Sequence, residues 1–393
     1  MTENHPERPS VPTSARASRP WSTVSASEGP RRLQRMGAVT VGVSLPRQWV
    51  GERGLTAGSA IHLRTLPDGS LLLRDRIRSA PIGRVWIPVG PSTAAEHLFR
   101  QLIGAYLGGA AEFVLNQPEG IAESTRGIAR LFARRTIQPE IVDEQATTLL
   151  LRDVSLGAGL ALPELLHRMF ERVMDLHTEA GRTWVAAGPA KGEPLNLRDD
   201  AVDRYGWLIE RILALRNASD AGAPGWGGSV DDPLQTLLLT RSMERIADHA
   251  VSLGENGTRL FDTGLPPKIA NALTGYHQQA LEALRSAVEV AERPQVTLAN
   301  EIIDAGEALH GAHAALSEAY LRRGSPSMLP PAAIAALGLA LASIDRTVAY
   351  AQDIAQVGLD RACWAEIGRT TTVDPIVPLP RTIPLRPALA PRA

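Results

Sequence analysis

The sequence predicts a multi-domain protein with a small β domain, an α/β linking domain and an all-α C-terminal part. Three observations lead to this prediction. Apolar residues alternate with small or polar ones near residue 40, strand-like and helix-like segments alternate over residues 84–153, and long amphipathic segments follow Pro163. The spacing of acidic pairs also indicates that the helical part is a tandem repeat of about 100 residues.

The composition sets limits on the class of protein. The 393 residues carry a net charge of −1, so any binding to nucleic acid must come from a local excess of positive charge. A single cysteine, Cys363, excludes an internal disulfide framework and fits a reducing compartment. The sequence has no run of about 18 apolar residues and no signal-type apolar core near its start. We therefore expect a cytoplasmic protein without membrane insertion.

The N-terminal β domain is predicted over residues 31–78. The alternation of Val39–Leu45 predicts a strand, Pro46–Gly54 a short helical turn, and Ile61–Leu63 a second strand. Asp68-Gly69 between leucines is a hairpin signal. Because a unit this small can hardly support its own core, we expect an obligate homodimer.

The two ends of the chain are predicted to be disordered. Residues 1–29 are rich in Pro, Ser, Thr, Arg and Glu without periodicity, and residues 369–393 are rich in Pro and Arg.

The linking domain is predicted over residues 84–156 as a compact β-α-β-α-β-β sandwich. Its expected strands and helices, in chain order, are Val85–Val89, Thr93–Leu107, Glu112–Leu115, Ile121–Arg134, Pro139–Val142 and Thr147–Leu151.

The helical part is predicted to contain two copies of three long helices, over residues 160–262 and 266–366. Asp232-Pro233 supplies an N-cap and a first-turn proline for the third helix. His177 and His277 correspond between the copies, and we interpret them as packing residues. The expected helices span residues 163–186, 196–217, 233–261, 267–292, 297–323 and 330–366.

Acidic pairs recur in this part at a fixed spacing. Asp199-x3-Asp203 is followed 45 residues later by Glu244-x3-Asp248, and both positions return at an offset of 101 as Asn300-x3-Asp304 and Asp345-x3-Ala349. One such pair alone is more often solvated surface. Two pairs on adjacent helices would bring four carboxylates together, which raises their pKa values unless a multivalent cation binds. The sequence therefore predicts a metal centre, to which His249 could add a nitrogen ligand.

The segment Met243–Ala250 resembles the E-R-I-x-D-H-A signature of PhoU-type phosphate-signalling regulators, and Asp199–Asp203 resembles the acidic motif of the preceding helix in that family. The resemblance covers about residues 160–366. It implies two three-helix repeats whose acidic motifs bind multinuclear metal clusters, with iron, Mg, Mn or Zn as the metal. The ligands it implies for the first cluster are Asp199, Asp203, Glu244 and Asp248.

The second copy departs from the PhoU pattern. Asn300 and Ala349 stand where the family has carboxylates, which leaves Asp304 and Asp345 as candidate ligands. We expect a full metal site in the first copy and a weak or absent site in the second.

The N-terminal domain carries a second resemblance. Arg31–Arg35, Ser44–Trp49 and Gly54–Gly58 resemble the AbrB/SpoVT swapped-hairpin fold, in the form found ahead of PhoU repeats in archaeal-type phosphate uptake regulators. Leu102–Leu107 resembles their linking segment. The AbrB/SpoVT resemblance implies a dimer that contacts DNA.

The charge of this domain supports DNA contact independently of the resemblance. Residues 31–54 contain five arginines and one acid, Glu52. Arginine binds phosphate oxygens well. The alternative is that these arginines are only solvated and the hairpin serves dimerisation. The candidate DNA-binding residues are Arg31, Arg32, Arg35, Arg47 and Arg53.

Together, the resemblances imply a metal-binding negative regulator of phosphate uptake and phosphate-starvation signalling that acts at phosphate-regulon promoters. Its expected partners are DNA, a second copy of the chain, and the ATPase of a phosphate ABC transporter or a sensor kinase. The alternative is an interaction module that controls the transporter or kinase by protein contacts without binding DNA. An enzyme is not expected, because the sequence carries no signature of an apolar substrate pocket.

Overall fold

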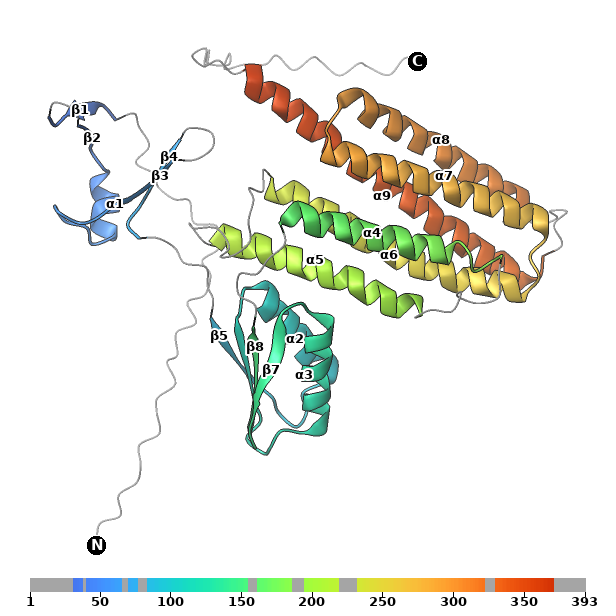
Figure 1. Cartoon of the computed structure of the whole chain (residues 1–393), viewed down its shortest axis with the longest axis horizontal. Helices are drawn as coiled ribbons and strands as arrows, with labels where there is room; N and C mark the ends of the chain where they lie inside the picture. The colour runs from blue at the N-terminus through green and yellow to red at the C-terminus, as the bar shows by residue number, and fades with distance from the viewer. Residues whose placement is uncertain are drawn as a thin grey trace, which may run out of the picture. The chain divides into compact units, whose positions relative to one another are not determined.

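The computed structural model describes residues 31–37, 40–65, 70–76, 83–154, 161–185, 194–218, 232–321 and 329–370. The chain forms two compact units, Met1–Ile77 and Arg78–Ala393 (Figure 1). The predicted N-terminal arm, the Asp68-Gly69 turn and residues 371–393 of the predicted tail lie outside the described residues.

The first unit contains two antiparallel strand pairs and one short helix. β1 pairs with β2 and β3 pairs with β4. Within the described part of the predicted strand Val39–Leu45, β2 covers Val41–Val43. Gly54 ends the helical turn with a φ of +63°, a conformation that glycine adopts without strain. The elements are β1 (Leu33–Arg35), β2 (Val41–Val43), α1 (Arg47–Glu52), β3 (His62–Thr65) and β4 (Leu71–Arg74).

This first unit has no core of its own among its described residues. None of them is buried, and Leu33, Val41 and Leu63 are 71%, 63% and 62% exposed. Exposed apolar side chains on paired strands are unfavourable in water. The described residues of this unit agree with the prediction that it can hardly support a core by itself.

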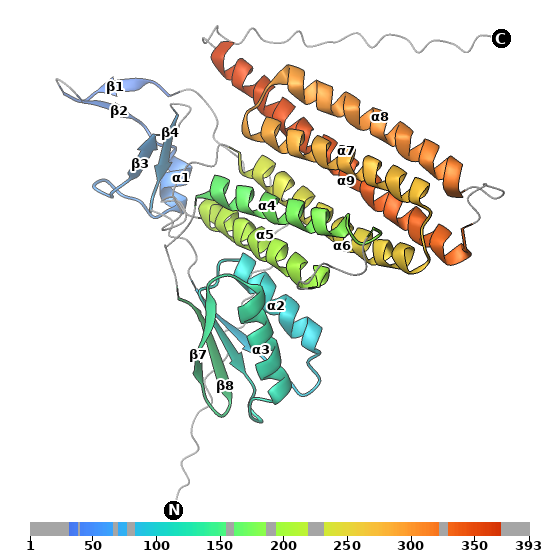
Figure 2. The ribbon, with the colours of Figure 1, turned by 45° about the vertical axis from the view of Figure 1, so that its right-hand side comes forward.

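The α/β part of the second unit has the predicted order of strands and helices. Its sheet has the strand order β5-β6-β8-β7, with β5 parallel to β6 and β8 antiparallel to both of its neighbours. The helices α2 and α3 lie side by side against the sheet (Figure 2). The elements are β5 (Arg84–Pro88), α2 (Ala95–Leu107), β6 (Glu112–Asn116), α3 (Glu123–Arg135), β7 (Pro139–Glu144) and β8 (Thr148–Asp153).

The predicted helices that follow are also present in the structure. Asp232 caps α6 by accepting hydrogen bonds from the backbone N–H groups of Leu234 and Gln235, as its position before Pro233 predicts. The first helix is shorter than predicted, because Gly181–Val185 form turns. The helices are α4 (Leu162–Ala180), α5 (Leu195–Ala218), α6 (Pro233–Asp262), α7 (Pro267–Glu292), α8 (Val296–Leu321) and α9 (Pro331–Thr370).

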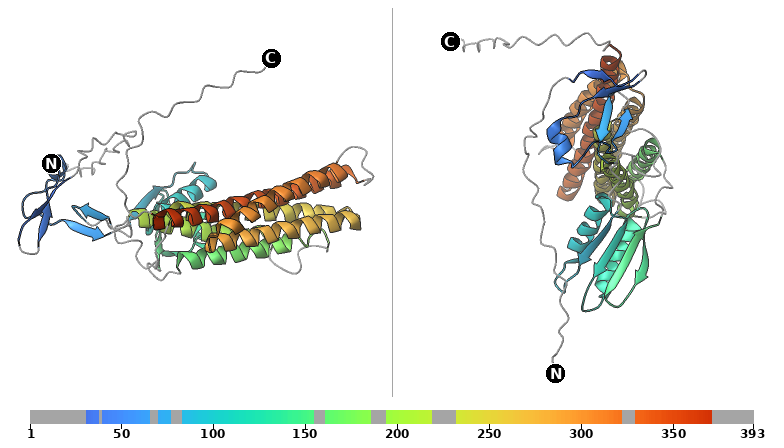
Figure 3. Two further views of the ribbon diagram at one scale, coloured as in Figure 1. Left: turned by 90° about the horizontal axis from the view of Figure 1, so that it is seen from above. Right: turned by 90° about the vertical axis from the view of Figure 1, so that its left-hand side faces the viewer.

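These helices form two groups that run alongside one another (Figure 3). The helices α4, α5 and α6 pack against each other, as do α7, α8 and α9, and the two groups meet mainly through α6 and α9. Each third helix therefore contacts its counterpart. By length and composition α9 could cross a membrane, but half of its apolar window is buried, and it packs against α6, α7 and α8.

Two buried histidines lie between the groups. The rings of His177 on α4 and His277 on α7 stack with centroids 5.6 Å apart. His177 Nε2 donates to the carbonyl of Ile246 at 3.1 Å, so its Nδ1 accepts from His277 Nε2 at 3.3 Å. Burial lowers the pKa of His177 to about 3 and that of His277 to about 4. Their predicted role in packing is confirmed.

Two arginines attach the α/β part to α5. The guanidinium of Arg211 is 2% exposed, donates to Asp153 Oδ2 at 3.1 Å and to the carbonyl of Tyr106, and lies 4.6 Å from the Tyr106 ring. Arg135, at the end of α3, pairs with Asp200 and Asp203 on α5. The α/β part and the first helical group are therefore joined by buried charge as well as by apolar contact.

Candidate functional site

The acidic motifs of the first copy lie on the packed helices α5 and α6. Burial first, and then Asp203 and Asp248, raise the pKa of Asp199 to about 7. Burial also raises the pKa of Glu244 to about 7, with Asp203 adding to the rise and Arg241 opposing it. Carboxylates that raise each other's pKa interact electrostatically. The four residues that the spacing selected thus lie on packed helices within electrostatic range of one another, and we call them the acidic cluster.

Arginines already neutralise part of the acidic cluster. Arg135 Nη2 lies 3.1 Å from Asp203 Oδ2 and also pairs with the adjacent Asp200. Arg241 bridges Glu210 at 2.6 Å and Glu244 at 2.8 Å. Burial still raises the pKa of Asp203 despite Arg135. No sequence pattern indicates Arg135 as a partner of the cluster, because it comes from the α/β part 68 residues upstream of Asp203.

One oxygen of the acidic cluster has no partner. Glu244 Oε1 is buried without a hydrogen bond. The backbone of Gly206 leaves the space around it, since a Cβ at that position would lie 2.1 Å from this oxygen. A carboxylate oxygen without a partner, close to carboxyl groups whose pKa values are raised, is a suitable ligand for a hard cation. Within the described ranges, however, no three His, Cys, Asp or Glu side chains are grouped closely enough to hold a metal ion. Metal binding would therefore require side-chain movement.

The second copy has a different environment. Asp304 lies exposed on α8. Asp345 on α9 lies beside His310, with 2.6 Å between Asp345 Oδ1 and His310 Nδ1. The same oxygen accepts a hydrogen bond from the Tyr276 hydroxyl at 3.2 Å. His313 Nδ1 lies 3.7 Å from the same oxygen. Burial lowers the pKa of His310, but its hydrogen bonds to Asp345 and Gln352 outweigh burial and raise it.

Sequence reasoning missed this His–Asp–Tyr group. The spacing of His310 and His313 places both on one helix face, which was the available signal. His249, the additional ligand considered for the first copy, packs its ring 6.0 Å from that of Tyr350.

The candidate DNA-binding arginines lie on the first unit. All five are exposed, and Arg53 pairs with Asp75 at 3.7 Å. The other four have no ion pair within the described part of the chain. Arg31 and Arg32 precede β1, Arg35 ends β1, and Arg47 begins α1.

Comparisons of the chain with protein-family models, with curated proteins and with solved structures found no match. Function is therefore inferred from the motifs and from the geometry above.

Proposed function

We propose that this chain is a cytoplasmic, metal-binding negative regulator of phosphate uptake and phosphate-starvation signalling that binds DNA as a homodimer. The observation that carries the proposal is the state of the first unit. Its described residues bury no core, and its strands expose apolar side chains. Arg31, Arg32, Arg35 and Arg47 are exposed and have no ion pair among the described residues. A second copy would cover the apolar side chains, and DNA phosphates would neutralise the arginines. The motif resemblances supply the phosphate context.

The helices α4 to α9, which we call the helical body, are the proposed sensory and partner-binding part. A cation held by Asp199, Asp203, Glu244 and Asp248 would neutralise carboxylates whose pKa values are raised. Because Arg135 of the α/β part binds two acids on the same helix, a bound cation would also change how firmly that part is attached to α5. The proposed protein partner is the ATPase of a phosphate ABC transporter or a sensor kinase.

Loss of Arg31, Arg32 and Arg35 of the first unit, which we call the head arginines, should weaken specific DNA binding. In Arg31→Ala/Arg32→Ala/Arg35→Ala, affinity for the promoter of the organism's phosphate-transporter operon should fall at least about tenfold. Each lost phosphate contact should also reduce the slope of log K against log salt by about 0.9. Fluorescence anisotropy over a salt series measures both quantities.

The matched control removes the same charge elsewhere. Arg100, Arg134 and Arg285 are exposed on the second unit, so their triple alanine variant should keep the DNA affinity. Sedimentation should show that both triple variants remain dimers. Equal binding by the head variant and the control would reject the DNA-binding proposal and leave the interaction module, which controls the transporter or kinase by protein contacts.

The acidic cluster should limit the stability of the metal-free protein. Glu244→Gln removes a buried charge and should raise the free energy of unfolding by about 1–2 kcal/mol at pH 8. The gain should shrink as pH falls through about 7, because the Glu244 carboxyl is then protonated in the folded protein. Asp248→Asn should change stability little, since that side chain is 56% exposed. Urea unfolding at several pH values measures this.

Metal titration separates the copies. Glu244→Gln and Asp248→Asn should both lower the amount of bound Mn²⁺, whereas Asp304→Asn should bind as the unaltered chain does. An equal loss in Asp304→Asn would contradict the asymmetry between the copies.

A further inference from the structure

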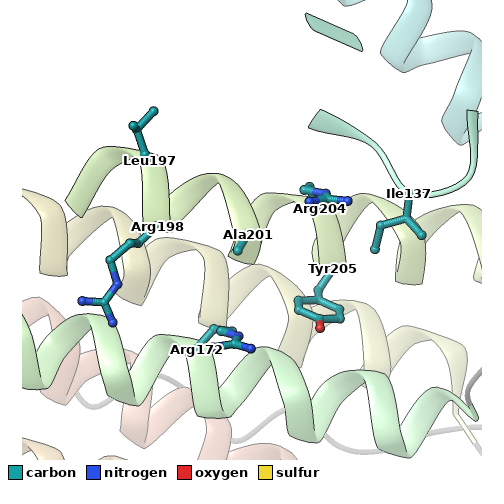
Figure 4. A pocket seen from close by; sticks show the side chains of 7 residues that line it. All are labelled: Ile137, Arg172, Leu197, Arg198, Ala201, Arg204 and Tyr205. Carbon is teal, nitrogen blue, oxygen red and sulfur yellow. The ribbon is translucent and has the colours of Figure 1, made fainter. Parts of the chain in front are cut away.

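A cavity of about 390 Å³ lies where α4, α5 and the segment before β7 meet. Three of its seven lining residues are arginines, Arg172 on α4 and Arg198 and Arg204 on α5. Figure 4 shows Arg198 and Tyr205 extending from α5 toward α4, with Arg172 between them and Arg204 near Ile137. No acid lines the cavity.

The positive charge of this cavity is poorly compensated. Arg172 has one ion pair, with Asp175 at 3.9 Å, and both side chains are more than half exposed. Arg198 and Arg204 have no ion pair among the residues that the structure describes. Arginines gathered in this way repel one another, and a bound anion relieves the repulsion. The cavity runs along the side of α5 from Leu197 to Tyr205.

The arginines are not needed to build a three-helix copy. The counterpart of Arg172 in the second copy is Ala272, at the offset of 100 that relates His177 to His277. The counterparts of Arg198 and Arg204, at the offset of 101, are Ala299 and Ala305. The corresponding helices α7 and α8 form without them. The cavity therefore carries charge that packing of the helices does not explain.

We propose that this cavity binds a phosphate-class oxyanion. Guanidinium groups donate paired hydrogen bonds to phosphate oxygens, and the volume accommodates one phosphate or a short chain of them. The proposal deepens the proposed function, on which it rests for its regulatory meaning, by naming the ligand that the helical body senses.

The position of the cavity connects the anion to the α/β part. Ile137, which lines it, follows Arg135 by two residues and accepts a hydrogen bond from Tyr106 at 3.0 Å. An anion in the cavity would contact residues on both sides of this junction. It would also lie on the helix that carries Asp199 and Asp203, so anion and cation binding would act on one element.

Isothermal titration calorimetry on the metal-free full-length chain tests the proposal, with orthophosphate and tripolyphosphate as separate probes. We expect at least one to bind with a Kd below about 1 mM. In Arg172→Gln/Arg198→Gln the Kd should rise at least about tenfold, because charge-assisted bonds are lost. Arg198→Lys keeps the charge but not the paired donors, so its Kd should lie between those of the unaltered chain and the double variant. Binding of orthophosphate indicates free phosphate as the ligand, and binding of tripolyphosphate alone indicates a polyphosphate.

The control Arg285→Gln/Arg293→Gln removes two exposed arginines outside the cavity and should leave the Kd unchanged. The proposal is overturned if neither anion binds, or if the cavity variant binds as tightly as the control. The cavity variant should still bind promoter DNA in the absence of phosphate. If the cavity variant loses anion binding but keeps DNA binding, the loss is due to the cavity alone. If the head-arginine variant binds DNA as its control does, the proposed DNA-binding function is rejected independently of the cavity.

Discussion

Asp153→Ala should lower the free energy of unfolding by about 3–5 kcal/mol, the largest effect that we expect from one substitution. Asp153 and Arg211 are each 2% exposed and joined at 3.1 Å. Of the two hydrogen bonds that Arg211 donates to Asp153 and Tyr106, the substitution removes the first. The guanidinium then stays buried without a carboxylate to neutralise it. An uncompensated buried charge is far more costly than an absent ion pair. Urea denaturation followed by circular dichroism measures the loss.

Two further variants isolate the cause of this loss. Asp153→Ala/Arg211→Met removes both charges and should recover part of the stability, because the buried cation is gone. Arg130→Ala breaks the exposed pair with Glu123, whose side chains are 55% and 74% exposed, and should cost less than about 1 kcal/mol. A loss in Asp153→Ala no larger than in Arg130→Ala would show that the buried pair does not hold the α/β part on α5.

Stability should also fall on acidification through the buried histidine pair. An unfolded histidine binds its proton near pH 6.5, whereas His177 and His277 in the folded protein do so only near pH 3 and 4. Below pH 6.5 the unfolded chain therefore binds more protons, and each histidine should remove about 1.4 kcal/mol per pH unit. Above pH 6.5 the pair makes no pH-dependent contribution.

The acidic cluster acts in the opposite direction over part of this range, because raised carboxyl pKa values favour the folded protein as pH falls below 7. The histidine effect is therefore measured in the Asp199→Asn/Glu244→Gln background, which lacks both of these carboxyl groups. There, His277→Phe should reduce the dependence of unfolding free energy on pH between 7 and 5. His167→Gln is the control, since that imidazole is 53% exposed. An unchanged dependence in His277→Phe would contradict the assignment.

The order of elements in the second unit followed from local sequence patterns. Apolar periodicity, the Asp232-Pro233 cap and the glycines between segments placed strands and helices within a few residues of those observed, because hydrogen bonding and amphipathic faces are set by near neighbours. In the first unit the same signals predicted the strand Ile61–Leu63, which corresponds to β3, and the turn that ends at Gly54. They did not predict β1. The three residues of β1 pair with β2, and nothing in their own pattern marks a strand.

The placement of the acidic motifs on α5 and α6 was predictable, because a constant offset places equivalent residues on equivalent helices. The spacing selected the four carboxylates as one candidate site, and their convergence on a metal stays a prediction. The surroundings of these carboxylates and of Asp345 come from tertiary packing. Arg135 from the α/β part lies beside Asp203, a Glu244 oxygen is buried without a partner near Gly206, and His310 lies beside Asp345. These contacts join residues that lie far apart in the chain. They depend on how the helices and the sheet pack, and periodicity within a segment carries no information about that packing.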